Sequence, residues 1–124
     1  MPLKTIFLIG LGGGLGSIFR YLISVYLMAK TTTIFPIGTF FVNLAGCFLI
    51  GLIYGLAVRE SWLSEDLRFL LATGFCGGFT TFSTFSFESF ELLKLGEYNT
   101  VVLYIGGSIV LGILLASVGF WLGK

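Results

Sequence analysis

Residues 74–88 carry the side chains that could do chemistry, and they read GFCGGFTTFSTFSFE. Glycines open the stretch, and hydroxyl side chains then alternate with phenylalanines. Glycine weakens a helix interior by roughly 1 kcal/mol relative to alanine, and Ser and Thr hydroxyls compete with the backbone for hydrogen bonds. We therefore expect a helix that breaks within residues 77–81. Carbonyls freed at Gly77 and Thr80 would offer oxygen ligands to a small cation, although a simple kink would explain the same composition.

Rings and hydroxyls beyond the expected break favour an anion path. Phe79, Phe82 and Phe85 are three residues apart, the spacing of one helix face, with Ser83 and Thr84 between the last two. An aromatic ring has a positive edge that can face an anion, and nearby hydroxyls can donate hydrogen bonds to it. Core packing or lipid contact is the alternative role for these rings.

Polar side chains in two other apolar stretches match this path. Thr39 and Asn43 are four residues apart in one stretch, and Tyr104 and Ser108 are four apart in another. Each pair therefore lies on one helix face. A polar group facing lipid is costly, so we expect these groups to face the protein interior. Interhelical hydrogen bonding is the alternative role for each pair.

Arg20 is the one charge deep in the first apolar stretch. At 1.5 Å of rise per residue it lies roughly 26 Å beyond Leu3, nearer the far membrane interface than the middle. It can snorkel to that interface beside Tyr21, or it can draw an anion into a vestibule. The two roles are compatible.

Four apolar windows must position these residues. Hydrophobic residues make up 56% of the 124-residue chain and charged residues 10%, with a mean hydropathy of +1.04; soluble domains are about 25% charged. A spanning helix needs about 20 apolar residues, which the windows at residues 3–29, 35–58, 67–93 and 98–122 provide. Short connectors make neighbouring helices antiparallel. We predict one all-α transmembrane domain of four helices, the third of them broken.

Charge and composition exclude several classes of function. The net charge of +1 and the absence of a basic run argue against nucleic-acid binding. The chain has no histidine, no base–nucleophile pair and no cofactor motif, so we do not expect an enzyme. Lys and Arg are only weakly biased to one side, which permits insertion in both orientations. Those on the richer side are Lys4, Arg59, Arg68 and Lys124, and those on the other are Lys30 and Lys94.

Three stretches resemble the bacterial fluoride channels of the CrcB/Fluc family. They are GGGLGSIFRY at residues 12–21, GTFFVNLAGCFLIG at 38–51 and GFCGGFTTFSTFSFE at 74–88. The third is the most specific of them, and the length and four-window layout also fit. The resemblance implies an antiparallel, dual-topology homodimer in the bacterial cell membrane, surrounded by lipid, that passively exports fluoride.

The resemblance also implies a role for each candidate residue. Carbonyls of Gly77 and Thr80 from both copies would hold a structural sodium ion at the dimer centre. Phe82 and Phe85 match the pore rings, Asn43 the pore asparagine and Arg20 the vestibule arginine. The remaining residues would form a polar track beside the rings: Thr39, Ser83, Thr84, Tyr104 and Ser108. Gly112 stands where some members have another hydroxyl.

Two other classes remain open from the sequence. A small multidrug-type proton-coupled exporter would share the length and four helices, but it relies on an acidic residue deep in its first helix. The first window here holds no Asp or Glu. An accessory membrane subunit without transport would not need hydroxyls and aromatic rings concentrated in one broken helix.

Overall fold

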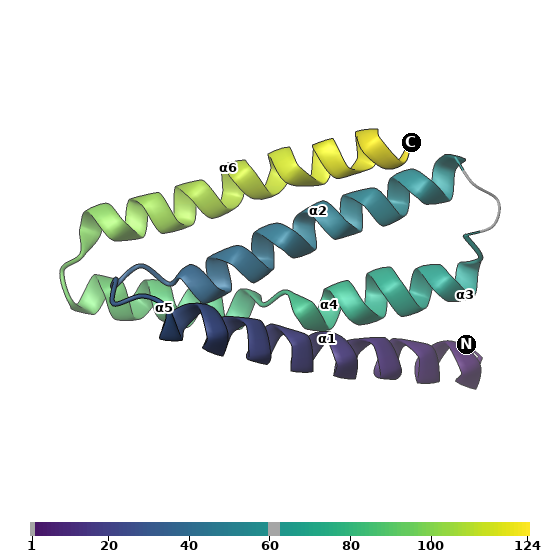
Figure 1. The fold of residues 1–124 in the computed structure, drawn as a ribbon, viewed down its shortest axis with the longest axis horizontal. Coiled ribbons are helices and arrows are strands. Elements are labelled where there is room, and N and C mark those ends of the chain that lie inside the picture. Colours follow the sequence, from purple (N-terminus) through teal and green to yellow (C-terminus); the bar gives the residue numbers. More distant parts are fainter. Residues whose placement is uncertain (1, 60–62) are drawn as a thin grey trace.

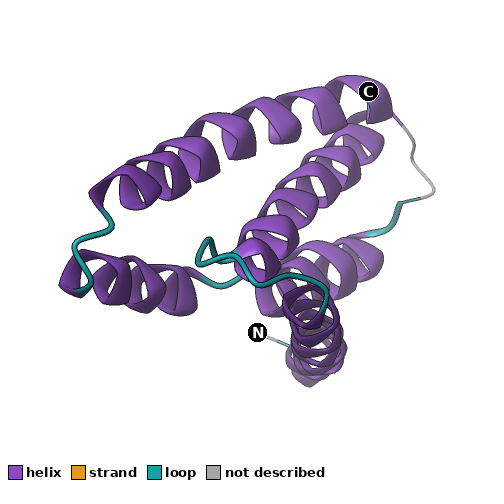
Figure 2. Cartoon of the chain, turned by 60° about the vertical axis from the view of Figure 1, so that its left-hand side comes forward, coloured by secondary structure: helices purple, strands orange, loops and turns teal. Residues whose placement is uncertain are grey.

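The computed structural model describes residues 2–59 and 63–124, and every regular element in them is a helix (Figures 1 and 2). Part of the predicted connector between the second and third windows, residues 60–62, lies outside the described residues. The all-α prediction is confirmed for the described part. In chain order the elements are α1 (Leu3–Ala29), α2 (Ile37–Arg59), α3 (Glu65–Arg68), the π-helix η1 (Phe69–Cys76), α4 (Gly77–Phe79), α5 (Phe82–Lys94) and α6 (Tyr98–Gly123).

Three of these helices, α1, α2 and α6, are long and apolar enough to cross a membrane. The third predicted window is divided among four shorter pieces, α3 to α5, which follow one another along the length of the molecule (Figure 1). A fourth span built from these pieces therefore stays a prediction. The three long helices confirm a multi-pass membrane protein.

Local sequence signals explain where several helices begin and end. The Ser64 side chain accepts a hydrogen bond from the Leu67 amide and caps α3. Glu65 and Asp66 follow in the first turn, where negative charge is favourable. Gly96, with φ of 75°, ends the α5 turn in the left-handed conformation that glycine adopts without a steric penalty.

Glycines allow α1 to lie directly on the backbone of η1 and α4. A Cβ atom at Gly12 would lie 2.2 Å from the Leu70 carbonyl oxygen, and one at Gly16 would lie 2.2 Å from the Phe75 carbonyl oxygen. The contact is reciprocal, because a Cβ at Gly78 would meet the Gly13 carbonyl. Small residues at such contacts let helices associate closely in lipid.

The predicted break is present, but it lies at the end of the expected range. Gly77 keeps helical φ and ψ of −61° and −39°, whereas Thr80 and Thr81 are extended, with ψ of 159° and 120°. The break therefore falls at the last two of the five residues in the predicted range. Gly78 serves the close approach to α1 and remains within α4, so it does not interrupt the helix.

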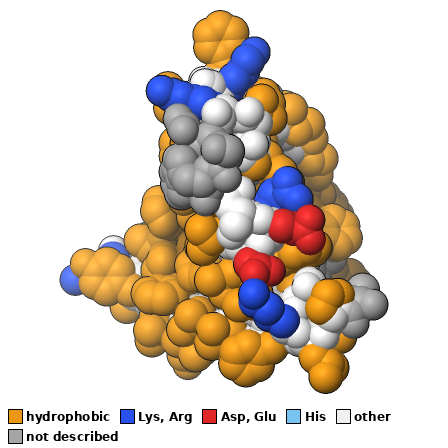
Figure 3. All heavy atoms as spheres, turned by 90° about the vertical axis from the view of Figure 1, so that its right-hand side faces the viewer, with side chains coloured by type: hydrophobic (Ala, Val, Ile, Leu, Met, Phe, Trp, Pro, Cys, Tyr) orange, Lys and Arg blue, Asp and Glu red, His pale blue; other side chains and the backbone are white. Residues whose placement is uncertain are grey.

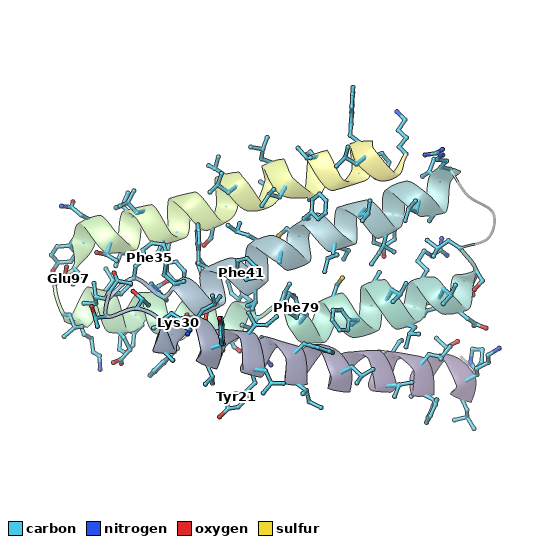
Figure 4. All side chains as sticks on the ribbon, in the orientation of Figure 1. Tyr21, Lys30, Phe35, Phe41, Phe79 and Glu97 are labelled. Atoms are coloured by element: carbon cyan, nitrogen blue, oxygen red, sulfur yellow. The ribbon has the colours of Figure 1, made fainter. Side chains whose placement is uncertain are left out.

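The molecular surface is largely apolar, and charged side chains lie toward its two ends. Figure 3 looks onto the end that holds both termini, where blue and red side chains lie among orange ones. Lys4 Nζ is 2.7 Å from Asp66 Oδ2, which ties the start of α1 to α3. Tyr21 points away from the other helices (Figure 4), as expected of a side chain on a lipid-facing surface.

Candidate functional site

Asn43 holds the backbone of the break. The Thr81 N–H donates to Asn43 Oδ1 at 2.8 Å, and Asn43 Nδ2 donates to the Thr81 carbonyl at 3.1 Å. The amide of one side chain on α2 thus pairs with both polar groups of one extended residue. Such pairing satisfies backbone groups that a broken helix leaves exposed at membrane depth.

The break leaves the Gly77 and Thr80 carbonyls without the amides that would bond them in a continuous α-helix. Those amides are four residues further on, at Thr81 and Thr84. The Thr81 amide is bonded to Asn43 instead, and the Thr84 amide donates to Thr81 Oγ1 at 3.2 Å. The second contact also makes Thr81 the N-cap of α5.

Arg20 reaches the break from the opposite side. Its Nε donates to the Gly78 carbonyl at 3.1 Å, and Ser17 Oγ lies 3.5 Å from the same oxygen. Arg20 is partly buried and directed toward the backbone of α4. Its guanidinium therefore has a protein partner in addition to any contact at the interface.

A hollow of about 520 Å³ opens beside the break, and it gathers most of the predicted residues. Phe82 lies at its edge with 78% of its surface exposed, whereas Phe85 is partly buried. The two ring centroids are 5.8 Å apart with an interplanar angle of 43°. The predicted residues that line the hollow are Asn43, Gly77, Thr80, Phe82, Phe85 and Ser108.

Ser108 lines this hollow and carries an unpaired hydroxyl. Within the part of the chain that the structure describes, its buried Oγ has no hydrogen-bond partner. Buried polar groups are normally paired, so an unpaired one calls for an explanation such as a bound ion or water. Gly112, one turn further along α6, faces the Cys47 sulfur and adds no donor.

Tyr104 is fully buried and packs between Phe85 and Phe35. Its ring centroid is 5.0 Å from that of Phe85 and 5.5 Å from that of Phe35. Its hydroxyl donates to Glu88 Oε1 at 2.8 Å. We assigned Glu88 no role from the sequence, although a lone acid at the end of the Phe and hydroxyl pattern was the available signal.

A second hollow, of about 300 Å³, lies on the other side of α5. Thr39, Thr84, Arg20 and Glu88 all border it. Thr39 is buried at the start of α2, so the predicted vestibule arginine and polar-track threonines converge there. Ser83 is exposed, with its hydroxyl 3.3 Å from that of Thr81.

Phe79 is separated from the other two predicted rings. It precedes the break, is 4% exposed and stacks on Phe75 at 5.6 Å between ring centroids. Figure 4 places Phe79 at the end of α4 beside the break. The expectation of one face shared by Phe79, Phe82 and Phe85 was wrong, because the extended residues reorient the chain between them.

Comparison with known proteins places this chain in a family. The model of the CrcB family, described as "CrcB-like protein, Camphor Resistance (CrcB)", matches residues 7–120. The chain belongs to the CrcB family. A relative from Phocaeicola vulgatus is 51% identical over 122 residues, which cover 98% of this chain and all of the relative. One from Azobacteroides pseudotrichonymphae is 48% identical over 118 residues, covering 95% and 94% of the two chains.

Both relatives of this CrcB chain carry the name "Fluoride-specific ion channel FluC". The resemblance to the CrcB/Fluc family is thereby confirmed. A family whose members are named as ion channels also confirms the prediction that the chain is not an enzyme. These names give no support to a multidrug-type exporter.

Proposed function

We propose that this chain is a fluoride-selective channel that passively exports fluoride from the bacterial cytoplasm. The observation that carries the proposal is the interrupted helix, whose aromatic rings border one hollow together with an unpaired hydroxyl. The shared name of its relatives supports fluoride as the ion. Fluoride enters cells as its neutral acid, so an open path for the anion is sufficient to lower its concentration.

The anion path runs along Phe82 and Phe85. The two rings are tilted relative to each other, and an aromatic ring has a positive edge that can face a small anion. Ser108 lines the same hollow, and its buried hydroxyl has no hydrogen-bond partner among the described residues. A narrow, rigid path favours a small anion over the larger chloride.

The entrance to this path lies at the smaller hollow. Arg20 supplies positive charge there, and Thr39 and Thr84 supply hydroxyls. Glu88 accepts a hydrogen bond from the Tyr104 hydroxyl at the same hollow, and this bond holds the Tyr104 ring against Phe85. A cation at a partly dehydrated entrance attracts an anion more strongly than one in bulk water.

Gly77 and Thr80 suit a structural sodium ion. Their carbonyls lack the usual helical amide donors, and backbone oxygens are the ligands that broken membrane helices offer to this ion. When bound, sodium supplies a fixed positive charge that offsets the cost of placing an anion in a low dielectric.

A second copy of the chain completes the path and the cation site. Phe82 is exposed although it carries the pore chemistry, and Thr73 and Gly77 are exposed beside it. Backbone polar groups do not face lipid tails, so this face requires protein cover. An antiparallel homodimer would bring two sets of Gly77 and Thr80 carbonyls together and leave lipid to cover the outer surface.

Liposome efflux tests the function directly. Purified protein is reconstituted into vesicles loaded with fluoride or chloride, and release is followed with ion-selective electrodes. We expect rapid fluoride release and no chloride release above that of empty vesicles. Equal release of both ions, or none of either, would contradict the proposal.

A further inference from the structure

The Thr81 amide has two possible acceptors, and Asn43 determines which one it uses. In a continuous helix this amide would donate to the Gly77 carbonyl. In the structure it donates to Asn43 Oδ1 at 2.8 Å, from a residue 38 positions away in the sequence. Asn43 also donates to the Thr81 carbonyl at 3.1 Å, so two bonds fix the extended residue to α2.

The Thr80 carbonyl also lacks its helical donor, because a side chain holds the amide that would bond it. Thr80 would be bonded by the Thr84 amide if the helix continued, but that amide donates to Thr81 Oγ1. The Thr81 hydroxyl in turn donates to Thr84 Oγ1 at 3.2 Å, which orients it as an acceptor for the amide. The side chains of Asn43 and Thr81 thus withdraw the helical donors from the Gly77 and Thr80 carbonyls.

We propose that Asn43 is a positioning residue of the cation site, in addition to any contact it makes with the anion. By holding the Thr81 amide, it leaves the Gly77 carbonyl available to a small monovalent cation. The inference rests on the proposed sodium site at Gly77 and Thr80, but not on the identity of the transported anion. It connects α2 to the cation through the backbone of the break.

Arg20 supports the same arrangement from α1. Its bond to the Gly78 carbonyl holds the last turn of α4 in place, three residues before the Thr81 contact. The break is therefore held on both sides by side chains from different helices. A carbonyl pair that must face a cation benefits from this, because preorganised ligands lose little freedom on binding.

Two readouts separate this role from a role in the anion path. A residue that only contacts the anion affects the maximal flux and leaves the sodium requirement unchanged. A residue that positions the carbonyls raises the sodium concentration needed for half-maximal effect. Ser108 provides the matched control, because it lines the same hollow as Asn43 and its hydroxyl makes no hydrogen bond to the break.

The experiment compares the wild-type chain with Asn43→Ala and Ser108→Ala. Sodium is varied against N-methylglucamine, and its binding is measured as the rise in thermal unfolding temperature of the purified dimer. We expect the half-saturating sodium concentration to rise at least about tenfold in Asn43→Ala, the effect of losing ~1.4 kcal/mol of ligand positioning. Ser108→Ala should keep the wild-type sodium dependence. An unchanged sodium dependence in Asn43→Ala would overturn the proposal.

A second variant covers the case in which Asn43→Ala does not fold. Thr81→Val removes the hydroxyl that holds the Thr84 amide and leaves Asn43 in place. We expect a comparable rise in half-saturating sodium concentration, because α5 loses its N-cap and the Thr84 amide can then compete with the cation for the Thr80 carbonyl. A wild-type sodium dependence in Thr81→Val would overturn the mechanism.

The wild-type measurements distinguish failure of this inference from failure of the proposed function. Saturable stabilisation by sodium without fluoride efflux would contradict the channel and leave the cation inference intact. Fluoride efflux without any saturable effect of sodium would overturn the inference and leave the channel intact.

Discussion

Tyr104 shows how one side chain can serve packing and the candidate pathway together. Its ring contacts Phe85 and its hydroxyl bonds to Glu88, so the position of the Phe85 ring depends on a buried hydrogen bond. Removing one partner of such a bond leaves the other unpaired, which costs about 1.5–3 kcal/mol when a charged group is involved.

Tyr104→Phe should therefore lower both stability and fluoride flux. We expect a loss of about 1–3 kcal/mol in the free energy of unfolding, because the Glu88 carboxylate loses its buried donor. Denaturant unfolding in detergent measures the first effect, and vesicle efflux the second. Tyr98→Phe, at an exposed position at the start of α6, is the control and should change neither. Equal stability of the two variants would argue against a structural role for the hydroxyl.

Phe82→Ile should reduce fluoride flux with little effect on folding. The ring is 78% exposed in the single chain, so few intrachain contacts are lost. We expect flux to fall about two- to tenfold, the range of an aromatic contact worth about 0.5–1.5 kcal/mol. Phe87→Ile, another exposed ring on α5, is the control and should retain wild-type flux in the vesicle assay. Wild-type flux in Phe82→Ile would indicate that the ring serves packing and not the anion path.

Among single residues, the types that carry the site were predictable from the sequence, but their partners were not. Asn43 was recognisable as an isolated amide in an apolar stretch. Its bond to Thr81 joins segments 38 residues apart, and no local pattern specifies that contact. The pairing of Tyr104 with Glu88 and of Arg20 with Gly78 was hidden for the same reason.

At the scale of the elements, length and hydropathy predicted α1, α2 and α6 closely, because a spanning helix needs a continuous apolar run. The third segment was predicted less well. We read its glycines as weak points of the helix, whereas Gly74 and Gly78 lie against the backbone of α1 and remain helical. The break falls instead at Thr81, where the Asn43 side chain from α2 takes the amide that would continue the helix.

The close contact between α1 and η1 gives a prediction for this scale. Gly12→Ala should destabilise the protein by about 1–3 kcal/mol, because the new Cβ would overlap the Leu70 carbonyl. Gly14→Ala is the matched control: it lies on the same helix, and nothing lies within 4 Å of a Cβ placed there. Thermal unfolding in detergent should separate the two variants. Equal melting temperatures would show that α1 can shift away without cost.

For the whole molecule, the surface of one chain has two kinds of exposed region. Most of it is apolar and suits lipid, but the face with Phe82, Thr73 and Gly77 exposes polar backbone beside the candidate site. Composition predicted the first kind. The second appears only in three dimensions, since it depends on which side of the break each residue faces.

Dual topology can be measured on the intact cell. Lys30→Cys and Lys124→Cys each add one thiol, at opposite ends of the molecule. With insertion in both orientations, we expect an impermeant maleimide to label about half of each variant from outside, as the weak Lys and Arg bias implies. Labelling of the native Cys47 and Cys76 in the unmodified chain sets the background. Full labelling of one variant and none of the other would show a single orientation.

The π-helix has a consequence for how this chain can change in length. In η1 the amide of Gly77 reaches back five residues, to the Ala72 carbonyl, so the segment has one residue more than an α-helix of the same hydrogen-bonded span. Deleting a residue there would restore α-helical hydrogen bonds, and the residues beyond it would keep roughly their present direction about the helix axis, because the bulge absorbs the extra residue. Thr80 and Thr81 would then stay near Asn43. A single-residue deletion within residues 69–76 should therefore lower the melting temperature less than one within residues 44–50 of α2, where the loss of a residue rotates one part of the helix relative to the other by about 100°.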